Sequence, residues 1–248
     1  MQATTTNAMD YFDKIFIINL PFRTDRKHEI SLELKKIGLS FDSPNVELFP
    51  AVRPESADGF PSIGTRGCFM SHLVILRKAK FAGYRRILIL EDDLDFDSDF
   101  SLRIVDVLNN IKQQVWSFCY GGYELLNVKA QSSEIICSVN SDDPIRTTHF
   151  IAIQGSAIAE LVAYLEEMLA RPSGHKDGGP MHVDGAYSWF RRANPILITL
   201  IAQPMLGHQR PSRTDIHDLN WYDRMAGMRE LVQLLRKAKR YFSKIIHK

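Results

Sequence analysis

Residues 87–93 read Ile-Leu-Ile-Leu-Glu-Asp-Asp, an aliphatic run that leads straight into three carboxylates. A continuous aliphatic run of this length predicts a buried strand, and Glu91 marks its end because acidic residues are depleted in strands. In open α/β sheets, ligands bind just beyond the carboxyl ends of the strands. Because Glu91, Asp92 and Asp93 repel one another, a divalent cation is a natural partner, and hard oxygen ligands favour Mg²⁺ or Mn²⁺. The alternative is an acidic turn without a ligand.

The elements that must position these acids alternate between strands and helices in the first half of the chain. Hydrophobic patterning predicts strands at residues 13–20, 46–52, 87–90, 115–120, 134–139, 147–153 and 196–202. It predicts helices at residues 25–37, 67–82, 102–111, 156–169 and 184–192. Turns or loops are expected at 54–65, Gly121–Gly122, 141–144 and 206–220. This order predicts an α/β fold with a mixed central sheet.

Size and composition fit a soluble globular protein of 248 residues with 24% charged residues. The three cysteines, Cys68, Cys119 and Cys137, form no disulfide or zinc pattern, and each is expected to be a core thiol in a reducing compartment. The sequence shows no secretory signal and no stretch of about 20 apolar residues. A cytoplasmic location is therefore expected.

Three segments are expected along the chain: a disordered leader over residues 1–12, one domain over 13–220, and a C-terminal helix over 221–248. From Trp221 onward the sequence contains eight Lys or Arg residues and two acidic residues. Apolar residues within 229–248 recur at helical spacing between these basic residues. A basic amphipathic helix of this kind can lie on an anionic membrane surface, such as the cytoplasmic membrane face, or can pack on its own domain.

Several sequence blocks together resemble glycosyltransferase family 25, which includes bacterial lipooligosaccharide galactosyltransferases and procollagen galactosyltransferases. The blocks are Phe16-Ile17-Ile18-Asn19-Leu20-Pro21-Phe22-Arg23-Thr24-Asp25-Arg26, Gly64-Thr65-Arg66-Gly67-Cys68-Phe69-Met70-Ser71-His72, Glu91-Asp92-Asp93, Thr148-His149-Phe150-Ile151-Ala152-Ile153, His182-Val183-Asp184, and Gln209 with Ser212. The resemblance covers roughly residues 14–216. One departure is Thr65, where the family usually has an acid, which questions a role of this position in acceptor binding.

The resemblance implies a GT-A-like nucleotide-sugar-binding fold and an inverting transferase. It implies that a sugar, galactose by analogy, moves from a UDP-sugar to a glycan or glycolipid acceptor such as lipooligosaccharide. Mn²⁺ or Mg²⁺ would assist by neutralising the departing diphosphate. The acidic cluster resembles the metal motif of GT-A enzymes.

On this basis Asp93 is assigned to the metal, Glu91 to the metal shell or the ribose, and Asp92 to either. Alternation along an extended strand would send Glu91 and Asp93 to one side and Asp92 to the other. By analogy with a late histidine in many GT-A enzymes, His208 is the third metal ligand. The nearby Asp95, Asp97 and Asp99 are expected to be solvated loop acids or helix caps.

The remaining donor-binding candidates lie at the first strand end and at a helix start. Arg23 and Arg26 follow the strand at the corner that faces the nucleotide in such folds, where Arg suits phosphate, although both could be solvated. Asn19 could bind the base or simply end the strand. Ser71 and His72, near a helix N-terminus that favours anions, could line the donor pocket or be structural.

Asp184 is the candidate general base, because it stands between the Gly- and Pro-rich loop 171–180 and a predicted helix. That loop is the best candidate for a mobile segment that closes over the site. An Asp at a helix start can also serve as an N-cap without any catalysis. His182 and Glu124 are the substitutes for the base. Polar and aromatic residues that could line a sugar site, or belong to the core, are His149, Gln154, Tyr187 and Trp189.

Two other classes of protein remain as alternatives. A non-catalytic sugar-nucleotide or glycan-binding protein could use the same fold, although the intact acids argue against it. A phosphoryl- or nucleotidyl-transfer enzyme would also use an acidic strand end, but the chain lacks a glycine-rich phosphate loop. Nucleic-acid binding is not expected, because basic residues cluster only in the tail.

Overall fold

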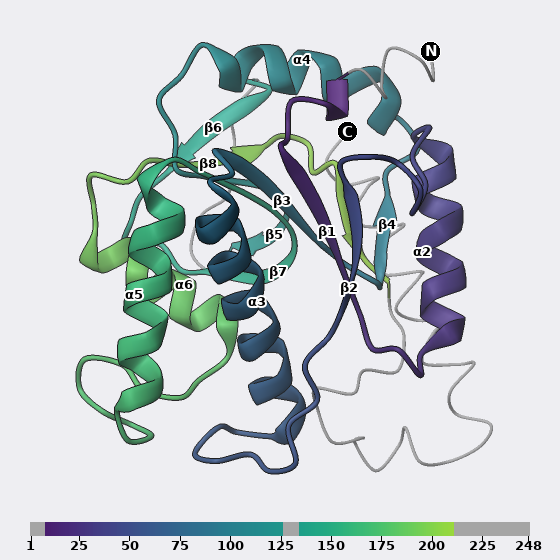
Figure 1. The fold of residues 1–248 in the computed structure, drawn as a ribbon. Coiled ribbons are helices and arrows are strands. Elements are labelled where there is room, and N and C mark those ends of the chain that lie inside the picture. Colours follow the sequence, from purple (N-terminus) through teal and green to yellow (C-terminus); the bar gives the residue numbers. More distant parts are fainter. Residues whose placement is uncertain (1–7, 126–133, 211–248) are drawn as a thin grey trace, which may run out of the picture. The chain divides into compact units, whose positions relative to one another are not determined.

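The computed structural model describes residues 8–125 and 134–210. Its centre is a mixed sheet of seven strands in the order β2-β1-β3-β7-β5-β8-β6 (Figure 1). The strands are β1 Lys14–Asn19, β2 Val46–Pro50, β3 Arg86–Glu91, β5 Phe118–Leu125, β6 Ile136–Val139, β7 Ile145–Gln154 and β8 Thr199–Ala202. Strand β1 is parallel to β2 and β3, whereas β7 is antiparallel to β3 and β5. The predicted α/β class with a mixed sheet is confirmed.

Helices cover both faces of the sheet (Figure 1). They are α2 Thr24–Lys36, α3 Ile63–Ala82, α4 Phe100–Lys112, α5 Ser156–Ala170 and α6 Val183–Ala193. In one layer of the hydrophobic core, alternate strand residues pack against α3, α5 and α6. In the other layer, the remaining strand residues pack against α2 and α4. Each predicted helix and strand in the described residues falls on an observed element, with boundaries shifted by a few residues.

Strand β3 reads as a continuous aliphatic run because both of its faces are buried. Ile87 and Ile89 belong to the layer of α3, whereas Leu88 and Leu90 belong to the layer of α2. The strand ends at Glu91, and residues 92–93 form a turn in which Asp92 and Asp93 both approach Arg26, at 2.9 and 3.6 Å. The alternation predicted for the three acids therefore does not continue past Glu91.

Helix α3 begins earlier than its predicted start at residue 67. The Ser62 hydroxyl accepts a hydrogen bond from the Thr65 backbone N–H at 3.0 Å and lies 2.8 Å from the Thr65 hydroxyl. Thr65 thus occupies the place that an acid takes in a capping box. Its buried side chain serves the helix start, which gives this departure from the family pattern a structural role.

A second, two-stranded sheet escaped sequence analysis. Strand β4 Leu94–Phe96 pairs antiparallel with β9 Gly207–Gln209, so that Asp95 lies opposite His208. Residues 206–220 had been expected to be irregular, and residues 207–209 are not. Strands of three residues carry too little periodicity to be detected, and the two partners lie far apart in sequence.

The glycine pair Gly121–Gly122 lies inside β5, which corrects its predicted role as a turn. A Cβ atom on Gly122 would come within 2.2 Å of His149 Nε2 and 2.7 Å of the Gly207 carbonyl oxygen. A Cβ on Gly121 would meet the Phe150 ring at 2.8 Å. The glycines are therefore needed for close packing against β7 and β9.

The predicted leader, residues 1–12, is too long at its C-terminal end, because Met9 and Phe12 are buried in the core. Residues 1–7 and the predicted terminal helix over 221–248, with its membrane-binding segment 229–248, lie outside the described residues. Within the described ranges, the helices are too short or too polar to span a bilayer.

We expect Gly122→Ala to destabilise the protein by about 1–3 kcal/mol, because the new methyl group would overpack against backbone. Thermal unfolding measures this as a fall of roughly 2–4 °C per kcal/mol. Gly185→Ala is the matched control, since its nearest contact is Met181 Sδ at 3.4 Å in helix α6. Equal melting temperatures for the two variants would contradict the packing argument.

Candidate functional site

Asp92 binds together the ends of β1 and β3. Its carboxylate accepts hydrogen bonds from Asn19 Nδ2 at 2.7 Å and from Arg26 NH1 at 2.9 Å, and all three side chains are buried. Burial raises the pKa of Asp92, although the Arg26 charge opposes this. The structure therefore brings three predicted donor-binding residues together, but it has them bind one another.

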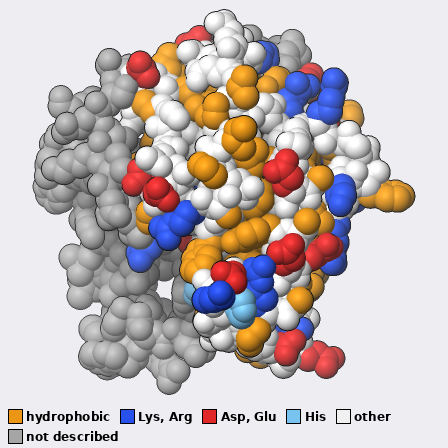
Figure 2. Space-filling model, turned by 90° about the vertical axis from the view of Figure 1, so that its left-hand side faces the viewer, with side chains coloured by type: hydrophobic (Ala, Val, Ile, Leu, Met, Phe, Trp, Pro, Cys, Tyr) orange, Lys and Arg blue, Asp and Glu red, His pale blue; other side chains and the backbone are white. Residues whose placement is uncertain are grey.

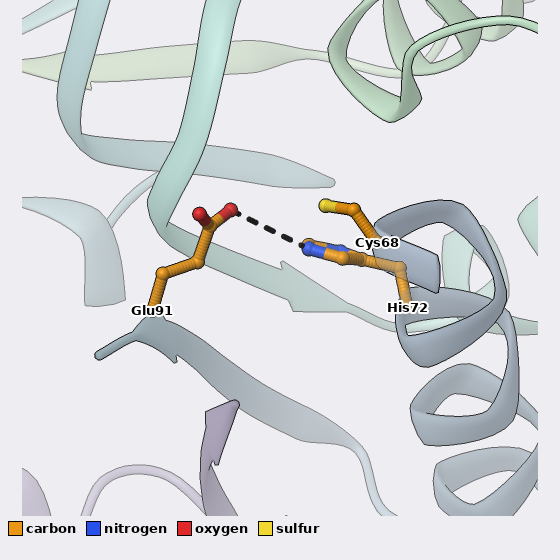
Figure 3. A group of neighbouring side chains, drawn as sticks. All are labelled: Cys68, His72 and Glu91. Atoms are coloured by element: carbon orange, nitrogen blue, oxygen red, sulfur yellow. Dashed lines mark ion pairs between the residues drawn. The ribbon is translucent and has the colours of Figure 1, made fainter. Parts of the chain in front are cut away.

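Glu91 points to the opposite side of the sheet, toward α3 (Figure 3). Its Oε1 accepts a hydrogen bond from Thr148 Oγ1 at 2.8 Å and lies 3.7 Å from His72 Nε2. Burial by itself raises the pKa of Glu91, but the neighbouring His72 imidazole outweighs it and the pKa is lowered. The other imidazole nitrogen, Nδ1, lies 2.9 Å from the buried Tyr187 hydroxyl. Tyr187, His72, Glu91 and Thr148 thus form a chain of polar contacts that connects α6, α3, β3 and β7.

Asp93 has the least satisfied carboxylate of the three. Its Oδ2 accepts a hydrogen bond from Gln209 Nε2 at 3.1 Å and lies 3.6 Å from Arg26 NH1. Its Oδ1 is buried and has no hydrogen-bond partner among the described residues. Burial raises the pKa of Asp93 to about 7, and the charge of Glu91 adds to this. A cation or a hydrogen-bond donor would relieve this carboxylate.

His208 does not join Asp93 and Glu91 in a compact metal site. Its Nδ1 lies 3.4 Å from Asp97 Oδ1, beside the β4–β9 pair. In the part of the chain that the structure describes, the three potential ligand groups found within 4.8 Å of one another are instead Cys68, His72 and Glu91. Asp93 and Glu91 therefore remain candidate ligands for a cation, and His208 is left out of that ligand set.

Sequence reasoning missed the role of Arg210, which holds β9 against β4. Its backbone N–H donates to the Asp93 carbonyl oxygen at 2.6 Å, and its guanidinium donates to Asp95 at 2.7 Å and also pairs with Glu29. These bonds fix the backbone next to the Asp93 carboxylate. Only the unforeseen β4–β9 pairing brings Arg210 there, so the sequence carried no signal for it.

Two other predicted donor-site residues have local partners. Arg23 binds Asp25 through two nitrogens, at 3.0 and 2.8 Å, and this contact lowers the pKa of Asp25 to about 2. The fully buried Ser71 hydroxyl donates to the Gly67 carbonyl oxygen at 2.7 Å and accepts from the Val52 backbone N–H at 2.8 Å. Ser71 therefore anchors helix α3 to the segment after β2.

Asp184 lies in the first turn of α6 and faces a strained residue. Its Oδ2 accepts from the Thr147 backbone N–H at 3.1 Å, and its Oδ1 accepts from the Gly185 backbone N–H at 2.7 Å. Thr147 has a φ angle of 68°, which is rare for a β-branched residue, and its buried Oγ1 has no partner among the described residues. Strain of this kind concentrates at functional sites.

The substitutes for the base lie apart from this contact. His182 occupies the N-cap position of α6, so Asp184 is not the cap itself. Glu124 is exposed on β5. Within the loop 171–180, Arg171 NH1 donates a hydrogen bond to the Asp177 carbonyl oxygen at 2.7 Å.

The four candidates for a sugar site separate in the structure. Tyr187 is buried on His72, and Gln154 donates to the Trp116 carbonyl oxygen at 2.8 Å. His149 is buried, and burial lowers its pKa. Trp189, on α6, is 37% exposed and is therefore accessible to a ligand.

Together these contacts define an α/β protein with an acidic site at the carboxyl end of a central strand, where such folds bind ligands. The family model described as glycosyltransferase family 25 (LPS biosynthesis protein) matches residues 12–156. The chain therefore belongs to glycosyltransferase family 25, as the sequence blocks had indicated.

Curated relatives carry related names. The chain is 28% identical over 136 residues to procollagen galactosyltransferase 2 of Homo sapiens, covering 48% of this chain and 22% of that protein. It is 31% identical over 141 residues to a glycosyltransferase 25 family member of Drosophila pseudoobscura pseudoobscura, with 48% and 22% covered. It is 24% identical over 140 residues to the inactive glycosyltransferase 25 family member 3 of Homo sapiens, with 49% and 24% covered. The alignments thus span less than a quarter of each relative.

Similar solved structures include a putative glucose-1-phosphate thymidylyltransferase from Bacillus anthracis, with a TM-score of 0.42, 12% identity, and 82% of this chain and 73% of that chain covered. Another is a glycosyltransferase involved in glycosylation of the major capsid of PBCV-1, with a TM-score of 0.37, 14% identity, and 77% and 92% covered. Likeness at this level carries no weight for function, and the family assignment rests on the sequence match.

We expect Asp93→Asn to stabilise the metal-free protein at pH 8. A raised pKa means that ionised Asp93 disfavours the folded state, so stability falls as pH rises from about 4 toward 7. The amide keeps an acceptor for Gln209 and removes the charge. Thermal unfolding with a chelator present should show a melting temperature several degrees above wild type at pH 8 and a smaller gap at pH 5.

Asp142→Asn, at an exposed acid, is the matched control and should leave the melting temperature unchanged. An Asp93→Asn variant that melts below wild type at pH 8 would contradict this argument and would show that the contacts with Arg26 and Gln209 outweigh the cost of burying the charge.

Proposed function

We propose that this protein is an inverting glycosyltransferase that moves galactose from UDP-galactose to a glycan acceptor such as lipooligosaccharide, assisted by Mn²⁺ or Mg²⁺. Family membership and relatives named galactosyltransferases support the class of reaction. The observation that carries the proposal is the Asp93 carboxylate, which is buried beside Glu91 with one oxygen unpartnered among the described residues. Burying a carboxylate in this way costs free energy unless a positively charged ligand binds it.

Asp93 and Glu91 are the residues that would hold the cation, since they supply oxygen ligands at the strand end. A bound divalent ion would act as a Lewis acid on the departing diphosphate. Thr148 and His72 orient Glu91, while Gln209 orients Asp93. Each of these carboxylates is thus held in one position before a donor arrives, which lowers the cost of reaching the reactive geometry.

The contact of Asn19 and Arg26 with Asp92 joins the end of β1 and helix α2 to the turn after β3, and so supports the proposed donor site from inside the protein. Arg23 lies at the same corner, where its side chain could exchange Asp25 for a phosphate oxygen. These assignments give Asn19, Arg26 and Asp92 a positioning role and leave Arg23 as the candidate for direct contact with the donor.

Asp184 is the proposed base that takes the proton of the acceptor hydroxyl. Its two oxygens each accept one backbone N–H, but a carboxylate has further lone pairs to offer. The adjacent Thr147 hydroxyl lacks a partner among the described residues, which supports its proposed role as a hydrogen-bond partner of the acceptor or the sugar.

We expect Asp93→Asn to reduce transfer by at least about 100-fold, because removal of a metal ligand forfeits several kcal/mol of charge stabilisation. Product formation from UDP-galactose and a lipooligosaccharide acceptor with Mn²⁺ is the measurement, after a screen of common UDP-sugars. Asp142→Asn should keep wild-type activity. An Asp93 variant as active as this control would defeat the metal assignment.

For Asp184→Asn we expect a loss of about 10²–10⁴-fold in kcat with the KM for the donor retained, as for removal of a general base. The amide nitrogen cannot accept the backbone bond it replaces, so a loss of about 1 kcal/mol in stability should accompany it. Steady-state kinetics and thermal unfolding measure the two effects. Near-normal kcat in a folded variant would remove Asp184 as the base.

A non-catalytic sugar-nucleotide or glycan-binding protein is the second candidate, because several relatives are named inactive or probable inactive family members. Donor binding without transfer or hydrolysis, across the common UDP-sugars with Mn²⁺, would favour it.

A further inference from the structure

Cys68, His72 and Glu91 form a cluster with mixed ligand chemistry beside the acidic strand end. Their sulfur, nitrogen and oxygen atoms all lie within 4.8 Å of one another, and Figure 3 shows the three side chains converging from α3 and β3. We propose that Cys68, His72 and Glu91 form a binding site for a thiophilic divalent cation such as Zn²⁺, which shares Glu91 with the oxygen site of Asp93 but takes its other two ligands from α3.

Helix geometry explains the convergence of two of the ligands. Cys68 and His72 are four residues apart in α3, so their side chains lie one above the other on the same face of the helix. That face meets the end of β3, where strand alternation directs Glu91 toward it. Cys68 and Glu91 are only half-buried, which leaves an approach for an ion.

The ligand atom at the inner end of the site, His72 Nε2, has Glu91 of the same cluster as its charged neighbour. His72 is fully buried, and its Nε2 has no hydrogen-bond partner among the described residues although it lies 3.7 Å from Glu91 Oε1. Zinc bonds of about 2.0–2.3 Å in a tetrahedral site place the ligand atoms roughly 3.3–3.6 Å apart. The His72–Glu91 distance is already close to this spacing, so modest side-chain movement would complete the site.

Two of the three ligand residues are also oriented by hydrogen-bonding contacts with neighbouring side chains, as metal ligands in proteins commonly are. The Tyr187 hydroxyl holds His72 Nδ1 at 2.9 Å and so directs Nε2 into the cluster. Thr148 Oγ1 holds Glu91 Oε1 at 2.8 Å. With three protein ligands, a fourth position stays open for water, which is the arrangement of a zinc site that is not purely structural.

The donor set distinguishes this site from that of Asp93. Thiolate and imidazole ligands favour Zn²⁺ and Co²⁺, whereas carboxylates alone favour Mg²⁺ and Mn²⁺. Burial raises the pKa of the Cys68 thiol, and the charges of Glu91, Asp184 and Asp93 add to this. The thiol is therefore protonated in the metal-free protein, and a bound cation would displace its proton and offset the surrounding negative charge.

Occupation of this site should oppose transfer, a consequence that rests on the proposed function. Glu91 belongs to both sites, so a zinc ion that draws it toward Cys68 withdraws it from the cation on Asp93. Cation binding itself does not depend on any transferase activity.

Cobalt binding to the untagged, chelator-treated full chain tests the site directly. One equivalent of Co²⁺ should produce a thiolate-to-cobalt charge-transfer absorption that Zn²⁺ abolishes. Cys68→Ser should lose this absorption and bind Zn²⁺ at least about 100-fold more weakly in competition with a chromophoric chelator. Cys137→Ser, at the other half-buried cysteine, should retain both. A wild-type chain without the absorption, or a Cys68 variant that keeps it, would overturn the proposal.

A second measurement needs no variant. Zn²⁺ should protect Cys68, but not Cys137, from alkylation, as read by peptide mass spectrometry. Equal alkylation of both cysteines with and without Zn²⁺ would also overturn the site.

Two further comparisons separate this inference from the proposed function. Asp93→Asn should keep the cobalt absorption, and its loss would refute a cation site that does not need Asp93. If transfer is observed, Zn²⁺ should inhibit wild type at concentrations at least about tenfold below those that inhibit Cys68→Ser, and equal inhibition would refute the competition for Glu91. If transfer is absent with every donor, the cobalt and alkylation results still decide the cation site.

Discussion

Mutual repulsion among three consecutive carboxylates at a buried strand end is the constraint on which the site depends. Strand β3 cannot end this way unless each acid finds its own partners, because burial and like charge both penalise ionisation. The end of the strand separates two of them: Glu91, its last residue, contacts His72 and Thr148, whereas Asp92, in the turn that follows, binds Asn19 and Arg26. Asp93 is left with partial compensation, and that deficit is the reason for proposing it as the cation ligand.

Several buried polar atoms lack hydrogen-bond partners among the described residues. Asp93 Oδ1, His72 Nε2 and Thr147 Oγ1 are buried without hydrogen-bond partners in the described segments, and Thr147 also has a strained backbone. By contrast, Ser71 and Asp92, which were also predicted to bind ligand, are fully bonded inside the protein. Buried polar atoms are normally paired, so these exceptions are candidates for contact with a ligand.

The family match and the site support each other at different levels. The match covers residues 12–156, which include the acids of β3 and the Thr147–Thr148 pair but neither Asp184 nor Gln209. The tertiary structure adds these two residues from α6 and β9, and so completes the surroundings of the acids from segments beyond the matched region. The alignments span less than a quarter of the curated relatives, so the acceptor and the donor remain matters of proposal for this chain.

The sequence by itself determined the α/β class, the strand that carries the acids, and the family. Aliphatic runs and helical periodicity are local, and the family blocks are contiguous, so both can be read without a structure. Tertiary structure alone decided the partners. The acids meet Gln209 and Arg210 through a pair of three-residue strands, and Gly122 serves close packing that no turn signal reveals. It also decided that Cys68 and His72, rather than His208, face Glu91. Contacts of this kind depend on which elements pack together, and that information lies in the whole core rather than in any short stretch of residues.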